Sequence, residues 1–168
     1  MLRHAKSSWD DPGLADHERP LGPRGQRAVK LLAQHVREEG IDPDLVLSSS
    51  ARRTQETLEG VAPPGERSIE PELYSASAED WLERLRVVPD TVESVMVVGH
   101  NPALQILVVH LAFDDGPPTV EPPYLSDVQG KFPTGALATL TFDCSWAELR
   151  PGRARLVAYV RPKQLGRN

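Results

Sequence analysis

Residues suited to phosphoryl chemistry occur in three short segments that lie far apart in the chain. Arg3 and His4 stand at its start, and His100 follows an apolar run near its middle. Between them, the segment 48–57 opens a helix that carries arginines in its first turn. Guanidinium groups offer paired N–H donors to phosphoryl oxygens, and an imidazole can serve as a nucleophile or as a hydrogen-bond donor. These residue types together predict a site that binds and transfers a phosphoryl group.

The proposed chemistry sets requirements for the histidines. A nucleophilic imidazole has to be neutral near pH 7, and flanking arginines lower its pKa because they disfavour the charged form. The same arginines can bind the non-bridging phosphoryl oxygens. A second histidine can donate to the oxygen that gains negative charge in the transition state. Covalent catalysis through one histidine then divides a single displacement into two easier steps.

Apolar periodicity and turn residues predict the elements that would position these side chains. Strands are expected at 44–47, 95–98, 136–142 and 155–160, and helices are expected to begin near Pro23, after one of Ser48, Ser49 and Ser50, after Ser77 and after Asn101. The segment 114–133, rich in Pro, Gly and Asp, is expected to be a long loop beside the pocket. This order predicts an α/β three-layer sandwich with a mostly parallel sheet. In open α/β sheets, ligands bind beyond the carboxyl ends of the strands, which is where the three segments fall.

The composition is typical of a soluble globular protein. The chain has 168 residues, 39% of them hydrophobic and 26% charged, which predicts a single domain spanning 1–168. The net charge of −5 argues against non-specific binding of nucleic acid. Apolar stretches are too short to cross a membrane and no signal sequence precedes the first motif, so a cytoplasmic location is expected. The single cysteine, Cys144, has no motif around it and is interpreted as a packing residue.

Histidines also bind metal ions or serve as structural residues, and the neighbouring residues bear on both alternatives. Arginines repel a cation, and no carboxylate has ligand spacing to either motif histidine, so no metal is expected. There is also no glycine-rich loop of the P-loop kind. His35 and His110 are expected to be core or surface residues, whereas His17, in the first loop, is a candidate to border the pocket.

The ordered motifs resemble the histidine phosphatase superfamily, whose fold is that of the phosphoglycerate mutases. Within it they are most similar to the small bacterial SixA-type phosphohistidine phosphatases. The resemblance covers nearly the whole chain and rests on 2–9, Arg19-Pro20-Leu21, Gly25, 49–57, Gly99-His100-Asn101-Pro102 and 131–136. Ala5 stands where the family signature has Gly. The family fold implies a mixed sheet with one antiparallel strand.

The resemblance assigns roles by position. It implies that His4 becomes phosphorylated, that Arg3 and Arg53 bind phosphate, and that His100 is the second catalytic histidine, also in contact with phosphate. Arg53 is preferred to Arg52 because the family's arginine lies four residues before a threonine, here Thr57. Neither a metal nor an organic cofactor is implied.

Three departures from the family are present, of which the last two bear on the substrate. The first strand is nearly absent, because the chain opens with Met1-Leu2. Ser75 stands roughly where larger relatives carry a carboxylate general acid, although Glu72, Glu79 and Asp80 are nearby in sequence. The segment 114–133, where selectivity for the substrate is expected to lie, has no recognisable signature. We therefore predict a phosphatase that acts through a phosphohistidine intermediate, with phosphohistidine on a protein as its substrate. A phosphatase of a small phosphomonoester, such as a nucleotide or sugar phosphate, and a non-catalytic phosphate-binding module are the alternatives.

Overall fold

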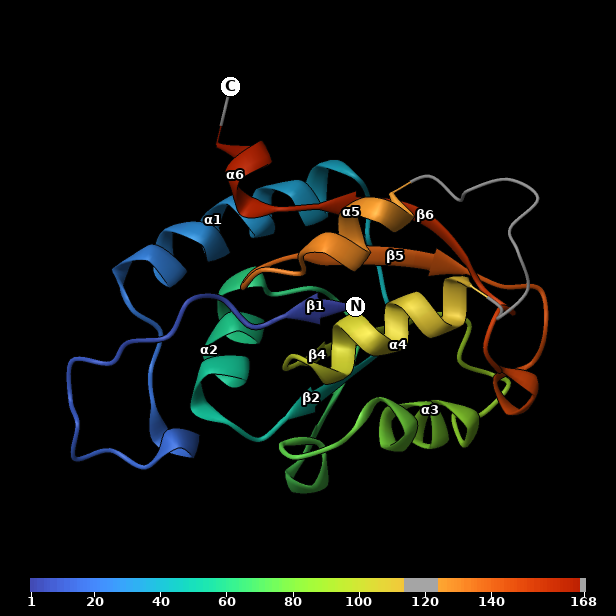
Figure 1. Cartoon of the computed structure of the whole chain (residues 1–168), viewed down its shortest axis with the longest axis horizontal. Helices are drawn as coiled ribbons and strands as arrows, with labels where there is room; N and C mark the ends of the chain where they lie inside the picture. Colours follow the sequence, from blue (N-terminus) through green and yellow to red (C-terminus); the bar gives the residue numbers. More distant parts are fainter. Residues whose placement is uncertain (114–123, 167–168) are drawn as a thin grey trace.

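A computed structural model describes residues 1–113 and 124–166 and shows a mixed sheet between two layers of helices (Figure 1). The strands are β1 (Leu2–Arg3), β2 (Leu45–Ser49), β3 (Glu66–Glu70), β4 (Val95–Gly99), β5 (Leu137–Thr141) and β6 (Arg155–Val160). Their order in the sheet is β3-β2-β4-β1-β5-β6. Neighbours are parallel from β3 to β1, whereas β5 runs antiparallel to both β1 and β6. The predicted mostly parallel sheet with one antiparallel strand is confirmed.

The helices cover both faces of this sheet, as a three-layer sandwich requires. They are α1 (Pro23–Glu38), α2 (Arg52–Val61), α3 (Ala78–Arg86), α4 (Ala103–Ala112), α5 (Leu125–Gly130) and α6 (Pro162–Leu165). Short 3-10 helices are η1 (Asp16–Glu18), η2 (Pro71–Leu73) and η3 (Trp146–Glu148). None of the helices in the described ranges combines the length and the hydropathy of a membrane-spanning segment.

Alternation along the central strands divides the core into two clusters. Val46 and Val98 pack with residues of α1 and α2, whereas their neighbours Leu47 and Val97 pack with residues of α3 and α4. Successive side chains of a strand point to opposite faces, so a strand covered on both sides is apolar throughout. This burial explains the apolar runs that predicted β2 and β4.

Two elements differ from the prediction. The strand β3 was not expected, because its sequence Glu-Arg-Ser-Ile-Glu is polar; it lies at the edge of the sheet, where charged side chains reach solvent. The helix α5 lies inside the segment predicted as a loop. It has only six residues, of which Leu125 and Val128 are buried, too few to give a helical period. The remainder of that loop prediction, 114–123, lies outside the described residues.

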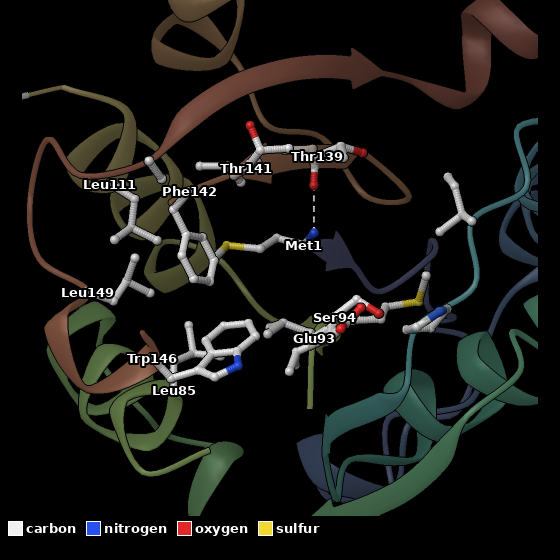
Figure 2. Close-up of a pocket in the computed structure, with 18 of the residues that line it drawn as sticks. Met1, Leu85, Glu93, Ser94, Leu111, Thr139, Thr141, Phe142, Trp146 and Leu149 are labelled. Carbon is white, nitrogen blue, oxygen red and sulfur yellow. Dashed lines mark hydrogen bonds between the residues drawn. The ribbon is translucent and has the colours of Figure 1, made fainter. Parts of the chain in front are cut away.

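A cavity of about 340 Å³ adjoins the short strand β1 (Figure 2). The amino group of Met1 donates to the carbonyl of Ala138 at a distance of 2.6 Å, and burial lowers the pKa of this amine to about 5. Apolar side chains such as Phe142 and Trp146 line the space beyond it. The cavity lies at the amino end of β1, away from Arg3.

The carboxyl ends of β1, β2 and β4 lie side by side, on the side of the sheet opposite to this cavity. Arg3 of β1 is paired with Gly99 of β4, and Ser48 of β2 is paired with Val98 of β4. The residues that follow β1, β2 and β4 are therefore neighbours in space although they are remote in sequence. This side of the sheet brings together the three segments that were predicted to carry the chemistry.

Candidate active site

His4 is held in one tautomer by the backbone that follows it. Its amide donates to the carbonyl of Gly99 at 3.0 Å, which fixes the residue beside β4. Its Nδ1 lies 2.7 Å from the carbonyl oxygen of Ala5. Because a carbonyl oxygen only accepts, Nδ1 carries the hydrogen, and the neutral ring has its lone pair on Nε2.

Burial keeps the His4 ring neutral. The pKa of His4 is lowered to about 3, first by desolvation of the buried ring and then by electrostatic repulsion from His100, Arg53 and Arg3. The hydrogen bond to Ala5 acts in the opposite direction and is outweighed. An uncharged imidazole with a free Nε2 is a competent nucleophile near neutral pH.

His100 lies beside His4, with a distance of 5.2 Å between the ring centroids. Its Nε2 is 2.7 Å from the hydroxyl oxygen of Ser49, and its Nδ1 is 3.5 Å from Nη2 of Arg53. A guanidinium can only donate, so this geometry favours a ring that accepts at Nδ1. Burial, followed by the charge of Arg53, lowers the pKa of His100 to about 4, although Asp16 opposes the shift.

Arg53 reaches the histidine pair from the first turn of α2. Its side chain is buried, whereas that of Arg52 is exposed and pairs with Glu56 at 2.8 Å. The hydroxyl of Thr57 donates to the carbonyl of Arg53 at 2.6 Å and accepts from the amide of Ala5 at 3.0 Å. Thr57 thus joins the start of α2 to the segment that carries His4. This link explains in physical terms why a threonine stands four residues after the inward-facing arginine.

Arg3 approaches from β1 and leaves one donor unpaired. Its Nη1 donates to the carbonyl of Phe132 at 2.9 Å. Its Nε is buried and forms no hydrogen bond within the described part of the chain. A buried unpaired donor costs free energy unless a partner arrives, and an anion is the natural partner for a guanidinium.

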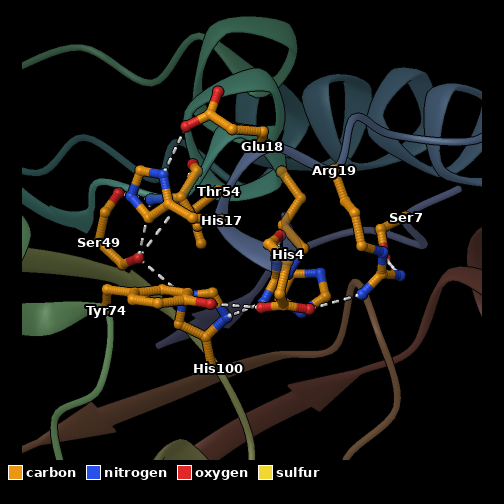
Figure 3. Close-up of polar contacts among 12 residues, drawn as sticks. His4, Ser7, His17, Glu18, Arg19, Ser49, Thr54, Tyr74 and His100 are labelled. Carbon is orange, nitrogen blue, oxygen red and sulfur yellow. Dashed lines mark hydrogen bonds and ion pairs between the residues drawn. The ribbon is translucent and has the colours of Figure 1, made fainter. Parts of the chain in front are cut away.

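Asp16 and Tyr74, which the sequence did not predict, also contribute to this cluster. Figure 3 shows Tyr74 beside His100. The Asp16 carboxylate accepts from Nη2 of Arg53 at 3.0 Å, from Nη1 of Arg19 at 2.9 Å and from the hydroxyl of Tyr74. The Tyr74 hydrogen bond, followed by those of the two arginines, holds the pKa of Asp16 well below its usual range. The Tyr74 ring is 5.6 Å from that of His100, centroid to centroid.

Other candidates from the sequence have clear positions. The ring of His17 lies 4.8 Å from that of Tyr74, so it borders the cluster, while His110 is exposed on α4. Asp80 forms the predicted capping box with Ser77 at the start of α3.

The remaining acid candidates and the cysteine add no group to the site. Ser75, Glu72 and Glu79 are exposed, and Tyr74 is the residue of this segment that reaches the site. Cys144 is partly buried and packs against the apolar core cluster. In residues 1–113 and 124–166, no group of three or more His, Cys, Asp or Glu side chains is arranged to hold a metal ion.

Comparisons with known proteins identify the family of the chain. Residues 1–85 match the family model of the histidine phosphatase superfamily (branch 1). An uncharacterised protein of Mycobacterium tuberculosis, Rv1276c, is 36% identical over 162 residues, which cover 96% of this chain and 100% of that protein. The phosphohistidine phosphatase SixA of Escherichia coli is 27% identical over 151 residues, covering 85% of this chain and 84% of SixA.

Solved structures extend the likeness to the fold. A protein of Nakamurella multipartitia, described as a candidate phosphohistidine phosphatase SixA, superposes with a TM-score of 0.86 at 28% identity, covering 96% of this chain and 94% of that chain. The protein histidine phosphatase SixA complexed with tungstate superposes with a TM-score of 0.76 at 25% identity, covering 98% and 96%. The chain belongs to the histidine phosphatase superfamily, in its SixA-type branch, and is a phosphatase.

Proposed function

We propose that this phosphatase removes the phosphoryl group from phosphohistidine on a protein, through a phosphohistidine intermediate formed on His4, with residues 1–168 acting as a single domain. Arg3, Arg53 and His100 bind the oxygens of the transferred group. His100 donates from Nδ1 once the phosphoryl group replaces the contact of this nitrogen with Arg53, while the Ser49 hydroxyl donates to its Nε2. The observation that carries the proposal is the His4 ring, which is neutral, donates from Nδ1 to Ala5 and has no hydrogen bond at Nε2 from the described residues, 1–113 and 124–166.

The reaction takes place in two displacements. Nε2 of His4 attacks phosphorus, and the bond from phosphorus to the substrate's imidazole nitrogen breaks, with the electron pair passing to that nitrogen. The substrate ring, which was protonated from solvent on its other nitrogen before the bond broke, leaves as neutral imidazole. Water then attacks phosphorus on phosphorylated His4, loses a proton, and releases inorganic phosphate while the P–N bond electrons return to Nε2. The donors of Arg3 and Arg53 match the negative charge that the transferring group carries in both steps.

The acid–base character of the site favours an imidazole leaving group over an alkoxide. Expulsion of an alkoxide is assisted by a positioned acid, which contributes ~10²–10⁴ in rate. The carboxylate of Asp16 is ionised and accepts three hydrogen bonds, so it has no proton to donate near neutral pH. An imidazole nitrogen, with an unperturbed pKa of about 6.5, takes up a proton before the bond breaks. A phosphoramidate substrate therefore needs no carboxylic acid.

The relatives support the same substrate class. The E. coli protein and the tungstate complex are named as phosphatases of phosphohistidine and of protein histidine, respectively. A protein substrate agrees with a site whose outermost groups, His17 and Tyr74, are partly exposed.

A substrate panel tests the proposal. The panel contains a phosphohistidine peptide, phosphoramidate, a simple alkyl phosphate, a nucleoside monophosphate and a sugar phosphate, and kcat/KM is measured for each with wild type and with His4→Ala. We expect kcat/KM to be at least ~10²-fold higher for the phosphohistidine peptide than for the alkyl phosphate, since the missing acid contributes on that scale.

Each alternative function has its own outcome in this panel. Equal kcat/KM for the peptide and a phosphomonoester would overturn the proposed substrate in favour of a small-molecule phosphatase. Binding of the phosphohistidine peptide without turnover of any member would overturn catalysis in favour of a binding module.

A further inference from the structure

The Asp16 carboxylate and backbone together hold one end of the Arg53 guanidinium. Nη1 of Arg53 donates to the backbone carbonyl of Asp16 at 2.7 Å, and Nη2 donates to its Oδ2 at 3.0 Å. A guanidinium is a planar group whose five N–H bonds form two forks, one across Nη1 and Nη2 and one across Nε and Nη2. Asp16 therefore fills the first fork.

The second fork faces the histidine pair. Neither contact with Asp16 uses Nε, and Nη2 has a second N–H that the carboxylate does not take. This Nη2 is 3.5 Å from Nδ1 of His100, whose ring lies 5.2 Å from that of His4. One N–H of the fork that Asp16 leaves open is therefore directed at the histidine pair, beside the proposed nucleophile, and a phosphoryl group bound there would take the place of this contact with His100.

Asp16 is itself tightly held. Arg19 donates to its other oxygen, Oδ1, at 2.9 Å, and Tyr74 donates to Oδ2. Arg19 is buried and is fixed in turn by the carbonyl of Ser8 at 3.0 Å and by the hydroxyl of Ser7. The loop that follows β1, the helix α2 and the segment after η2 all meet at this one carboxylate.

We propose that Asp16 is a positioning residue, which locks the far end of the Arg53 guanidinium so that its Nε–Nη2 fork is presented to the phosphoryl group. This role rests on the proposed function, because it specifies how one phosphate-binding arginine of that site is oriented. Pre-ordering of the guanidinium removes the cost of arranging it when the substrate binds.

The direction in which phosphate affinity changes distinguishes a positioning role of Asp16 from simple repulsion of phosphate by its carboxylate. A carboxylate near an anion repels it, so removal of the charge alone would tighten the binding of inorganic phosphate. Loss of a positioning contact has the opposite effect, because the guanidinium is released from its productive orientation. Asp16→Asn keeps the shape of the side chain and removes the charge.

The experiment measures the Kd of inorganic phosphate and kcat on the phosphohistidine peptide for Asp16→Asn. We expect phosphate to bind at least ~5-fold more weakly and kcat to fall ~10- to 100-fold, the scale of a misplaced catalytic contact. Asp10→Asn, which removes the same charge from an exposed position of the same loop, is expected to leave both values within ~2-fold. Tighter binding of phosphate or faster turnover in Asp16→Asn would overturn the proposal.

A double-mutant cycle with Arg53→Ala shows whether Asp16 acts through Arg53. In an Arg53→Ala background, Asp16→Asn is expected to change phosphate affinity less than ~2-fold, because the group it orients is gone. An equal loss in both backgrounds would overturn the role. If Asp16→Asn does not fold, Tyr74→Phe is used in its place. Loss of one donor to the carboxylate predicts an ~3-fold weaker phosphate affinity, and this difference should disappear in the Arg53→Ala background. An unchanged affinity in Tyr74→Phe contradicts the proposal.

The phosphate measurement is independent of turnover. A wild type that binds phosphate but hydrolyses no member of the substrate panel would overturn the proposed function, while the sign of the Asp16→Asn effect still decides the positioning role.

Discussion

Two neighbouring arginines at the start of α2 show that a shift of one position in a helix determines whether a side chain faces the site or the solvent. A step of one residue turns the helix by about 100°. Arg53 is buried and lies against His100, whereas Arg52 is exposed and pairs with Glu56 within its own helix. The two guanidiniums have the same charge and the same reach, so the difference between them is one of direction only.

This difference leads to a prediction for catalysis. Arg53→Ala should lower kcat/KM for the phosphohistidine peptide by ~10²–10³, because a donor to the transferring group is lost. Arg53→Lys should recover little of that loss, since an ammonium cannot replace a planar fork. Arg52→Ala, the matched control, should remain within ~3-fold of wild type, because an exposed ion pair within one helix contributes little. Equal losses for the two alanine variants contradict the assignment.

Individual residues also mark the limit of what the sequence could predict about the site. His4, Arg53 and His100 each follow a recognisable strand or lie at a fixed spacing from Thr57, so local pattern and family resemblance located them. Asp16 and Tyr74 lie in segments without a repeating pattern. They meet only because the loop after β1 folds over α2, a contact between residues 58 positions apart. Local spacing carries no signal for such a contact.

At the scale of elements, a close backbone contact fixes the loop after β1 against the first helix. A Cβ added to Gly25 would lie 2.2 Å from the carbonyl oxygen of Lys6, nearer than any real Cβ contact. The amide of Gly22 donates to that same carbonyl at 2.9 Å. The absence of a side chain at Gly25 therefore allows the start of α1 to press against the segment that follows His4.

We predict that Gly25→Ala disturbs both stability and activity. The methyl group has to displace the backbone of Lys6, so we expect a loss of roughly 2 kcal/mol or more in the free energy of unfolding, within the range of overpacking. The same shift moves the segment of His4 and should lower kcat. Gly130→Ala is the control, because nothing lies within 4 Å of a Cβ built there. Denaturant unfolding and kcat are measured for both, and a Gly25→Ala variant as stable and as active as wild type contradicts the account.

The elements that the sequence predicted correctly are those whose burial leaves a pattern. The strands β2 and β4 are apolar because helices cover both faces, and α3 begins at a capping box that is visible as Ser77 and Asp80. The edge strand β3 and the one-and-a-half-turn helix α5 lack such a pattern. Their structure comes from pairing with β2 and from packing against α4, contacts that leave no repeating pattern within β3 or α5 themselves.

At the scale of the whole molecule, the site imposes a pH dependence on folding. The pKa of His4 is about 3 and that of His100 about 4 in the folded protein, both below the ordinary value of 6.5. Between pH 6.5 and pH 4 the unfolded chain binds more protons than the folded protein. The free energy of unfolding therefore falls as the pH is lowered through this range. The buried amine of Met1, with a pKa of about 5, adds the same sign below pH 8.

We therefore predict that the free energy of unfolding decreases on acidification from pH 7 to pH 4. One unit of pKa shift corresponds to about 1.4 kcal/mol, so the two histidines together contribute a decrease of several kcal/mol. His4→Gln and His100→Gln should each flatten the curve in this range, whereas His110→Gln, at an exposed position, should leave its shape unchanged. Urea unfolding at several pH values measures the effect. Curves of the same slope for wild type and both site variants would be inconsistent with buried neutral histidines.

The central claim is that His4 carries the phosphoryl group during turnover, and trapping of the covalent intermediate tests it most directly. Wild type is mixed briefly with the phosphohistidine peptide labelled with ³²P, quenched in alkali and digested, and the labelled peptide is sequenced. We predict alkali-stable, acid-labile label on the peptide that contains His4, absent from His4→Ala and retained in Arg52→Ala. Label that persists in His4→Ala, or that resides on a peptide without His4, contradicts the account.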